Sequence, residues 1–178
     1  GVVENQEREA VLTLRYIEPA IEALKRGGHT VHLLDSGWYP ERHAAANDIA
    51  RQHPAEKVAY LACHINAGKG DYMVCIHDSR SMNGRDLANY IAKSAAFHGL
   101  PDVRRFLTRA ANATNDWRRG YSTIKGIYQG PSNISGICFE PYFIANPEQV
   151  YLSTHEGGEF IAEALVHGLE RWENGWET

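Results

Sequence analysis

Two short, almost uninterrupted apolar runs constrain the fold of this chain more than any other feature. They cover residues 58–64 and 134–140, and each lies between polar segments. Such runs are typical of strands that are covered on both faces, which occur mainly in sheets with helices on both sides. Further strands are expected over residues 71–77 and, more briefly, over residues 29–34.

Amphipathic helices alternate with these strands. Apolar residues recur at helical spacing over residues 10–24, where Pro19 is expected to kink the helix, and a glycine pair at 27–28 ends it. Three more helices are expected, over about residues 41–51, 85–98 and 158–172. Residues 100–133 are polar and weakly periodic, which predicts a long functional loop.

The alternation of helices and strands predicts an α/β fold of three layers, with a mostly parallel twisted sheet flanked by helices. We find no internal repeat and no linker, so residues 1–178 are expected to form a single domain. A chain of 178 residues with 43% apolar residues buries enough surface to fold without disulfides or a structural metal.

Charge and cysteine content narrow the class of protein further. The formal net charge is -4 and the basic residues are dispersed, which argues against a nucleic acid partner. No apolar stretch approaches the roughly 18 residues of a membrane span. Cys63, Cys75 and Cys138 lie in apolar runs and indicate buried, reduced thiols, with a Cys63–Cys75 pair across neighbouring strands as the alternative.

Two ionisable residues stand at the carboxyl ends of these apolar runs, His64 at the end of one and Glu140 at the end of the other. Ligands of open α/β sheets bind at the carboxyl ends of the strands, so these side chains are candidates for one shared site. Taken singly, a histidine or glutamate at a strand end is more often structural or solvated than catalytic.

A wider set of segments resembles a known family. The segments follow one another in the order that the family shows, at residues 9–14, 28–31, 42–47, 63–67, 139–148 and 160–168. Together they resemble the zinc-dependent N-acetylmuramoyl-L-alanine amidases of the amidase type 3 family, found in bacterial cell-wall hydrolases and phage endolysins. The resemblance covers most of the chain outside residues 78–133.

The resemblance implies a role for individual residues. Glu9 and His64 correspond to zinc ligands, and Glu140 corresponds to the catalytic residue that takes a proton from the zinc-bound water and passes it to the leaving amine. Zn²⁺ would lower the pKa of its water to about 7 and polarise the scissile carbonyl. Asn66 and Asn146 are candidate substrate-binding residues, although asparagine near strand ends is often structural.

One departure from the family pattern concerns the metal. The family's first ligand is a histidine in a G-H-G-like turn after a first strand, and this chain begins after the corresponding position. We expect that strand and turn to lie in a segment outside this sequence. The alternatives are a substitute histidine, for which His77 is the first candidate, and a domain that is not an active zinc enzyme.

The expected function is hydrolysis of the amide between N-acetylmuramic acid and L-alanine in peptidoglycan, with peptidoglycan or muropeptides as the partner and a monomeric state. The expected location is the cell wall, periplasm or exterior, or the cytoplasm before release for an endolysin. Two alternatives stay open. One is an inactive regulator or peptidoglycan-binding module, and the other is a zinc amidohydrolase of small acyl-amino acids.

Overall fold

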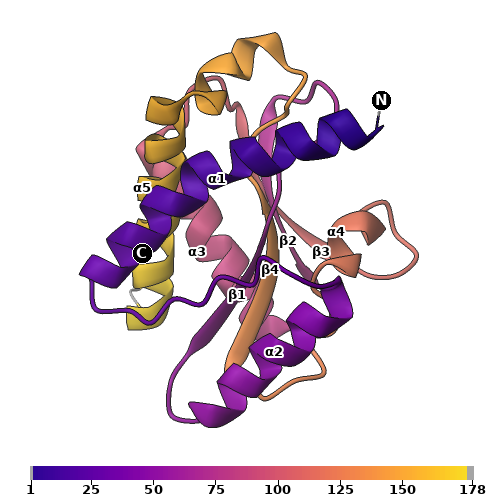
Figure 1. Ribbon diagram of the computed structural model, residues 1–178, viewed down its shortest axis with the longest axis vertical. Helices are drawn as coiled ribbons and strands as arrows, with labels where there is room; N and C mark the ends of the chain where they lie inside the picture. Colours follow the sequence, from indigo (N-terminus) through magenta and orange to yellow (C-terminus); the bar gives the residue numbers. More distant parts are fainter. Residues whose placement is uncertain (1, 176–178) are drawn as a thin grey trace.

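The computed structural model describes the backbone of residues 2–175, with side chains from residue 8 onward. Helices and strands alternate along most of this part of the chain (Figure 1). In order, they are α1 (Val2–Arg26), α2 (Tyr39–Gln52), β1 (Val58–Cys63), β2 (Tyr72–Asp78), α3 (Met82–His98), β3 (Arg105–Ala111), α4 (Arg118–Ser122), β4 (Ile134–Glu140), the 3-10 helix η1 (Pro147–Ser153) and α5 (His155–Asn174).

The strands form one sheet in the order β1-β4-β2-β3. The outer pairs β1–β4 and β2–β3 are parallel, and the central pair β2–β4 is antiparallel. The predicted, mostly parallel sheet is therefore confirmed. Because the central pair is antiparallel, the carboxyl ends of β1 and β4 lie at one end of the sheet. The carboxyl ends of β2 and β3 lie at the opposite end.

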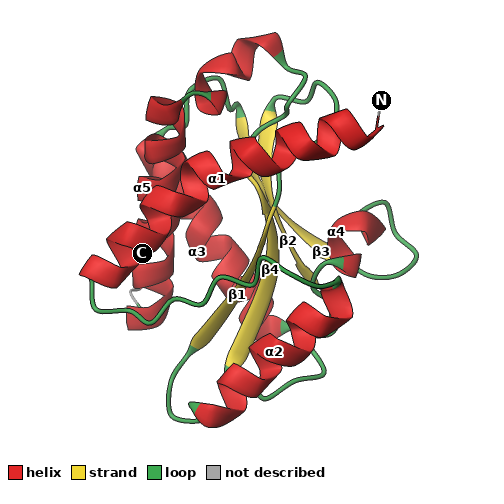
Figure 2. Ribbon diagram, in the orientation of Figure 1, coloured by secondary structure: helices red, strands yellow, loops and turns green. Residues whose placement is uncertain are grey.

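Helices cover both faces of the sheet, which confirms the predicted three layers (Figure 2). One apolar cluster joins α1, α3 and α5 to one face, and a second joins α2 and the segment around α4 to the opposite face. Side chains of β4 alternate between the two clusters, with Phe139 in the first and Cys138 in the second. Such alternation is the expected result of the two-residue period of a strand.

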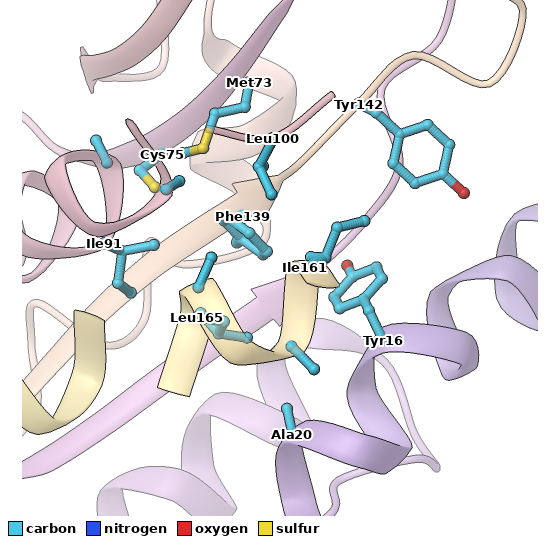
Figure 3. Packing of buried hydrophobic residues seen from close by; sticks show 14 of the residues in the cluster. Tyr16, Ala20, Met73, Cys75, Ile91, Leu100, Phe139, Tyr142, Ile161 and Leu165 are labelled. Carbon is cyan, nitrogen blue, oxygen red and sulfur yellow. The ribbon is translucent and has the colours of Figure 1, made fainter. Parts of the chain in front are cut away.

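The first cluster is closed by α1 (Figure 3). The ring of Tyr16 is fully buried and meets the ring of Phe139 edge to face, at 5.9 Å between centroids. Ala20, one helical turn further, packs in the same cluster as Ile161 and Leu165 of α5. Apolar spacing along α1 thus serves to attach this helix to α5 and the sheet.

Helix ends follow local rules. The Ser81 hydroxyl accepts a hydrogen bond from the backbone N–H of Gly84 at the start of α3, and Gly99 ends that helix in the left-handed conformation at φ 69°. The predicted helices over 41–51, 85–98 and 158–172 are confirmed; each begins two or three residues earlier than expected, and α3 ends at His98 as expected.

Two predictions about elements are wrong. Residues 29–34 form no strand: they run as an irregular connection in which Leu33 is 54% exposed, and within the described residues β1 pairs only with β4. The predicted long loop contains β3 and α4. β3 is an edge strand that is half exposed, so it lacks the apolar run by which a central strand is recognised.

Two further expectations are refined. β1 is an edge strand with partial burial, but its side chains alternate between the two clusters, so both of its faces are covered as expected. All three cysteines are free thiols, which leaves no Cys63–Cys75 disulfide. No helix in the part of the chain that the structure describes is long and apolar enough to cross a bilayer.

Candidate active site

The register of β1 and β4 brings His64 and Glu140 to the same edge of the sheet. Cys63 of β1 pairs with Phe139 of β4, and the backbone N–H of His64 donates to the Phe139 carbonyl at 2.9 Å. His64 and Glu140 are therefore the next residues along two adjacent parallel strands. The convergence expected from the two apolar runs is present in the structure.

α1 adds a carboxylate to this edge. The Oε1 atom of Glu9 lies 3.0 Å from Nδ1 of His64 and accepts a second hydrogen bond, of 3.2 Å, from the backbone N–H of Ile65. Burial acts to raise the pKa of Glu9, but the hydrogen bonds from His64 and Ile65 outweigh it and hold the pKa below its usual value. Glu9 is therefore ionised, and Nδ1 of His64 carries the hydrogen between them.

The other ring nitrogen of His64 is also occupied. Its Nε2 lies 3.2 Å from the hydroxyl of Tyr39, in the first turn of α2, and accepts from it when the ring is neutral. The side chains of Glu9 and His64 remain 30% and 29% exposed. The His64 ring is thus hydrogen-bonded at both nitrogens, and the Glu9–His64 pair is still accessible to solvent.

Tyr16 fixes the backbone at the same place. Its buried hydroxyl donates a hydrogen bond of 3.0 Å to the carbonyl oxygen of His64. Tyr16 lies two helical turns beyond Glu9 on α1, so one helix both supplies the carboxylate and positions the strand end that carries the histidine.

Glu140 has an environment that suits proton transfer. Burial raises its pKa to about 6; the nearby His64 lowers it, and the Glu9 carboxylate adds to the rise. Its Oε1 also lies 4.0 Å from the thiol sulfur of Cys138. A carboxyl with a pKa near neutrality can both take and give a proton at physiological pH.

The two asparagines have different surroundings. Asn66 lies just beyond β1, where its backbone bridges to Phe143. Asn146 is buried, and both ends of its amide are in use: Oδ1 accepts from the N–H of Glu148 at 3.0 Å, and Nδ2 donates to the carbonyl of Gly70 at 2.8 Å. These contacts favour the structural interpretation for Asn146.

His77 cannot replace the missing ligand. It pairs with Ile137 in the antiparallel β2–β4 ladder, whereas Glu140 pairs with Val74, so His77 lies three strand positions away from Glu140 along the sheet. At about 3.3 Å per residue this is roughly 10 Å. His77 is buried, and its Nδ1 lies 2.9 Å from the carbonyl oxygen of Asp78.

Glu9 and His64 are donors of the type that zinc prefers, but their number is too small. A catalytic zinc ion normally takes three protein ligands. Across residues 2–175, as far as their side chains are described, no group of three or more His, Cys, Asp or Glu residues could hold a metal ion. The residues brought together here therefore do not complete a zinc site by themselves.

Sequence reasoning missed the two tyrosines that position His64. Tyr39 lies before the helix expected over residues 41–51, but Pro40 and Glu41, which accompany helix starts, are a signal that α2 begins there. Tyr16 falls on the buried face of α1 and has no sequence signal that separates it from an ordinary core residue.

Comparison with solved structures relates this geometry to known proteins. The chain is similar to an N-acetylmuramoyl-L-alanine amidase of Clostridium difficile 630 (TM-score 0.66, 17% identity, 95% of this chain and 86% of the other) and to the amidase Ami1 of Mycobacterium smegmatis (TM-score 0.70, 16% identity, 94% and 78%). It is also similar to the catalytic domain of the CD27L endolysin, which targets Clostridia difficile (TM-score 0.60, 16% identity, 92% and 83%). This chain has the N-acetylmuramoyl-L-alanine amidase fold.

The amidase fold therefore confirms the architecture that the resemblance implied. No protein-family model and no curated protein matches the chain. Because the sequence identity to these amidases is low, the comparison shows only that the arrangement of helices and strands is shared. The roles of Glu9, His64 and Glu140 then depend on their own geometry.

Proposed function

We propose that this protein hydrolyses the amide bond between N-acetylmuramic acid and the first L-alanine of the peptidoglycan stem peptide. The observation that carries the proposal is the contact of 3.0 Å between Glu9 and His64, with Glu140 at the next strand end, in a chain with the amidase fold. These are the residues at which the resemblance to the family requires a carboxylate, an imidazole and a proton carrier.

Glu140 would carry the proton in this reaction. With a pKa of about 6 it is mainly a carboxylate at neutral pH, so it can accept a proton from an attacking water and deliver it to the leaving amine of L-alanine. Glu9 and Tyr39 hold the His64 ring from its two nitrogens, which keeps the ring in one orientation beside the reacting groups.

Zinc dependence is part of the proposal, with Glu9 and His64 as two of the donors; the His64 nitrogen that binds zinc would give up its hydrogen bond to Glu9 or Tyr39. When bound, zinc would act as a Lewis acid on the scissile carbonyl. Since the described residues bring together only two such donors, we propose that the third comes from outside this set. The substrate places the protein's action at the cell wall, whether in the periplasm, outside the cell or after release as an endolysin.

Digestion of purified peptidoglycan tests the activity. We expect new amino groups on L-alanine together with intact glycan strands, and Glu140→Gln should lower the rate at least about a hundredfold because a positioned proton carrier contributes roughly 10²–10⁴. The exposed His32→Ala serves as the control and should keep the wild-type rate. Release of reducing sugar ends in place of L-alanine amines would contradict the proposal.

Zinc content tests the metal. His64→Ala and Glu9→Gln should each lose zinc after desalting, whereas Glu140→Gln and His32→Ala should retain it, because only the first two remove a proposed donor. Zinc measured by mass spectrometry at wild-type level in His64→Ala would exclude His64 as a ligand.

A second candidate function is peptidoglycan binding without catalysis. The incomplete donor set favours it, because a site with two donors holds zinc weakly. Under this alternative the protein co-sediments with insoluble peptidoglycan but releases no L-alanine amines, and Glu140→Gln leaves the binding unchanged.

A further inference from the structure

A cavity of about 780 Å³ lies among α1, α3 and α5, in the helical layer on one side of the sheet. Its lining carries four carboxylates, Glu22, Glu159, Glu163 and Glu170, against one guanidinium, Arg26. Since α1 advances about 1.5 Å per residue, Glu22 lies roughly 20 Å along the helix from Glu9. The cavity is therefore separate from the candidate active site, and its charge attracts cations.

Two histidines meet in the wall of this cavity. His98 is the last residue of α3 and His167 lies on α5, and both are partly exposed. Nε2 of His98 is 3.1 Å from Nδ1 of His167, with the two rings nearly perpendicular at 78°. An exposed aromatic ring, Phe97, packs within 5.7 Å and 6.0 Å of the two imidazoles, measured between ring centroids.

A third electron-rich atom contacts His167. The Oγ atom of Ser94, which is fully buried, lies 3.3 Å from Nδ1 of His167. The Ser94 hydroxyl hydrogen is already donated to the carbonyl of Ala164, at 2.8 Å. The two ring nitrogens therefore face each other, and the hydroxyl oxygen contacts one of them. When both imidazoles are neutral, at most one ring hydrogen lies between the two nitrogens.

The separation of the two nitrogens matches chelation. Two metal–nitrogen bonds of about 2.0–2.1 Å span roughly 3.1 Å when the angle at the metal is roughly 100°. That angle lies between the square-planar and tetrahedral values. The packing of Phe97 and the burial of Ser94 hold the rings near this geometry before any ion arrives.

We propose that His98 and His167 form a binding site for a divalent transition metal ion, distinct from Glu9 and His64. Imidazole is a good ligand for such ions, and in the usual affinity order Cu²⁺ binds most tightly. In the part of the chain that the structure describes, no third His, Cys, Asp or Glu joins the pair as a ligand, so water fills the remaining positions. The carboxylates of the cavity add long-range attraction.

Titration with Cu²⁺ tests this site. The titration uses His64→Ala as the parent, so that the candidate active site contributes nothing. We expect one equivalent to bind to the parent, and His98→Gln or His167→Gln to weaken the binding more than about tenfold, since even outer-shell changes cost 10–100-fold. The control is His155→Gln, an exposed histidine on the same helix α5, which should bind as the parent does.

A second measurement is made on the parent alone, in case the histidine variants fail to fold. The electron paramagnetic resonance spectrum of the bound Cu²⁺ should show two equatorial nitrogen ligands, and NMR signals of Ser94, His98 and His167 should broaden first. Equal Cu²⁺ affinity in folded His98→Gln and His167→Gln, or broadening centred elsewhere, would overturn the proposal and leave a ring-to-ring hydrogen bond. Loss of amidase activity in any of these proteins bears only on the proposed function.

Discussion

A single carboxyl group, that of Glu140, carries both an expected activity and a measurable effect on stability. It is partly buried at the end of β4, close to the ionised Glu9, and burial raises its pKa to about 6 from 4.5. Protonation of Glu140 is therefore more favourable in the folded protein than in the unfolded chain. Ionisation of Glu140 acts against folding, and the size of this effect depends on pH.

Replacement by glutamine should reveal this effect. Below pH 4.5 the group is protonated in both states, and above pH 6 it is ionised in both, so wild-type stability falls relative to Glu140→Gln as pH rises between these values. We expect the variant to be more stable by about 2 kcal/mol at pH 8 and about equal to wild type at pH 4. Urea unfolding at the two pH values measures the difference; a constant difference would contradict it.

Sequence and structure agree on some site residues and differ on others for definite reasons. Glu9, His64 and Glu140 could be located because ordered motifs and strand ends mark them. Tyr39 could not, because its role depends on how α2 lies against the end of β1. The idea that His77 could act as a substitute failed because the antiparallel β2–β4 pairing is not visible in the sequence.

At the scale of elements, α3 and α5 pack closely against each other. A Cβ atom placed on Gly168 would lie 2.8 Å from the Cα of Ile91, which is backbone and cannot move aside without shifting α3. Glycine in the middle of a helix costs roughly 0.5–1 kcal/mol relative to alanine. The close approach of the two helices is the reason that glycine occupies this position.

Gly168→Ala should therefore destabilise the protein despite the better helix propensity of alanine. Overpacking typically costs about 1–3 kcal/mol, so we expect a net loss of about 1–2 kcal/mol in the free energy of unfolding. Glu163→Ala, on an exposed position of the same helix, is the control and should change stability by less than about 0.5 kcal/mol. A more stable Gly168→Ala protein would mean that the helices pack less closely than described.

Predictability of elements follows their burial. The central strands β2 and β4 and the helices α3 and α5 were recognisable because long stretches of each face the core. β3 was missed because one face and one edge meet solvent. Residues 29–34 have strand-like composition, yet a strand also needs a neighbour with which to pair, and no local pattern reports that.

For the whole molecule, this arrangement predicts a gradient of local stability. β2 and β4 each have a partner on both sides and are buried, whereas β1 and β3 are edges and residues 29–38 lie outside the sheet. Amide hydrogen exchange should be slowest in β2 and β4 and fastest in residues 29–38. Exchange followed by mass spectrometry measures this order, and strong protection of residues 29–38 would show that they pair with a strand after all.

The attachment of α1 to α5 has a consequence for the protein's synthesis. Tyr16 and Ala20 share their core with Ile161 and Leu165, but α5 starts only at His155. At 5–20 residues per second, the ribosome makes α5 on the order of ten seconds after α1. During that interval the part of the apolar face of α1 that packs against α5 lacks this partner, and apolar surface exposed in this way is prone to aggregate. The core closes only once translation has passed α5.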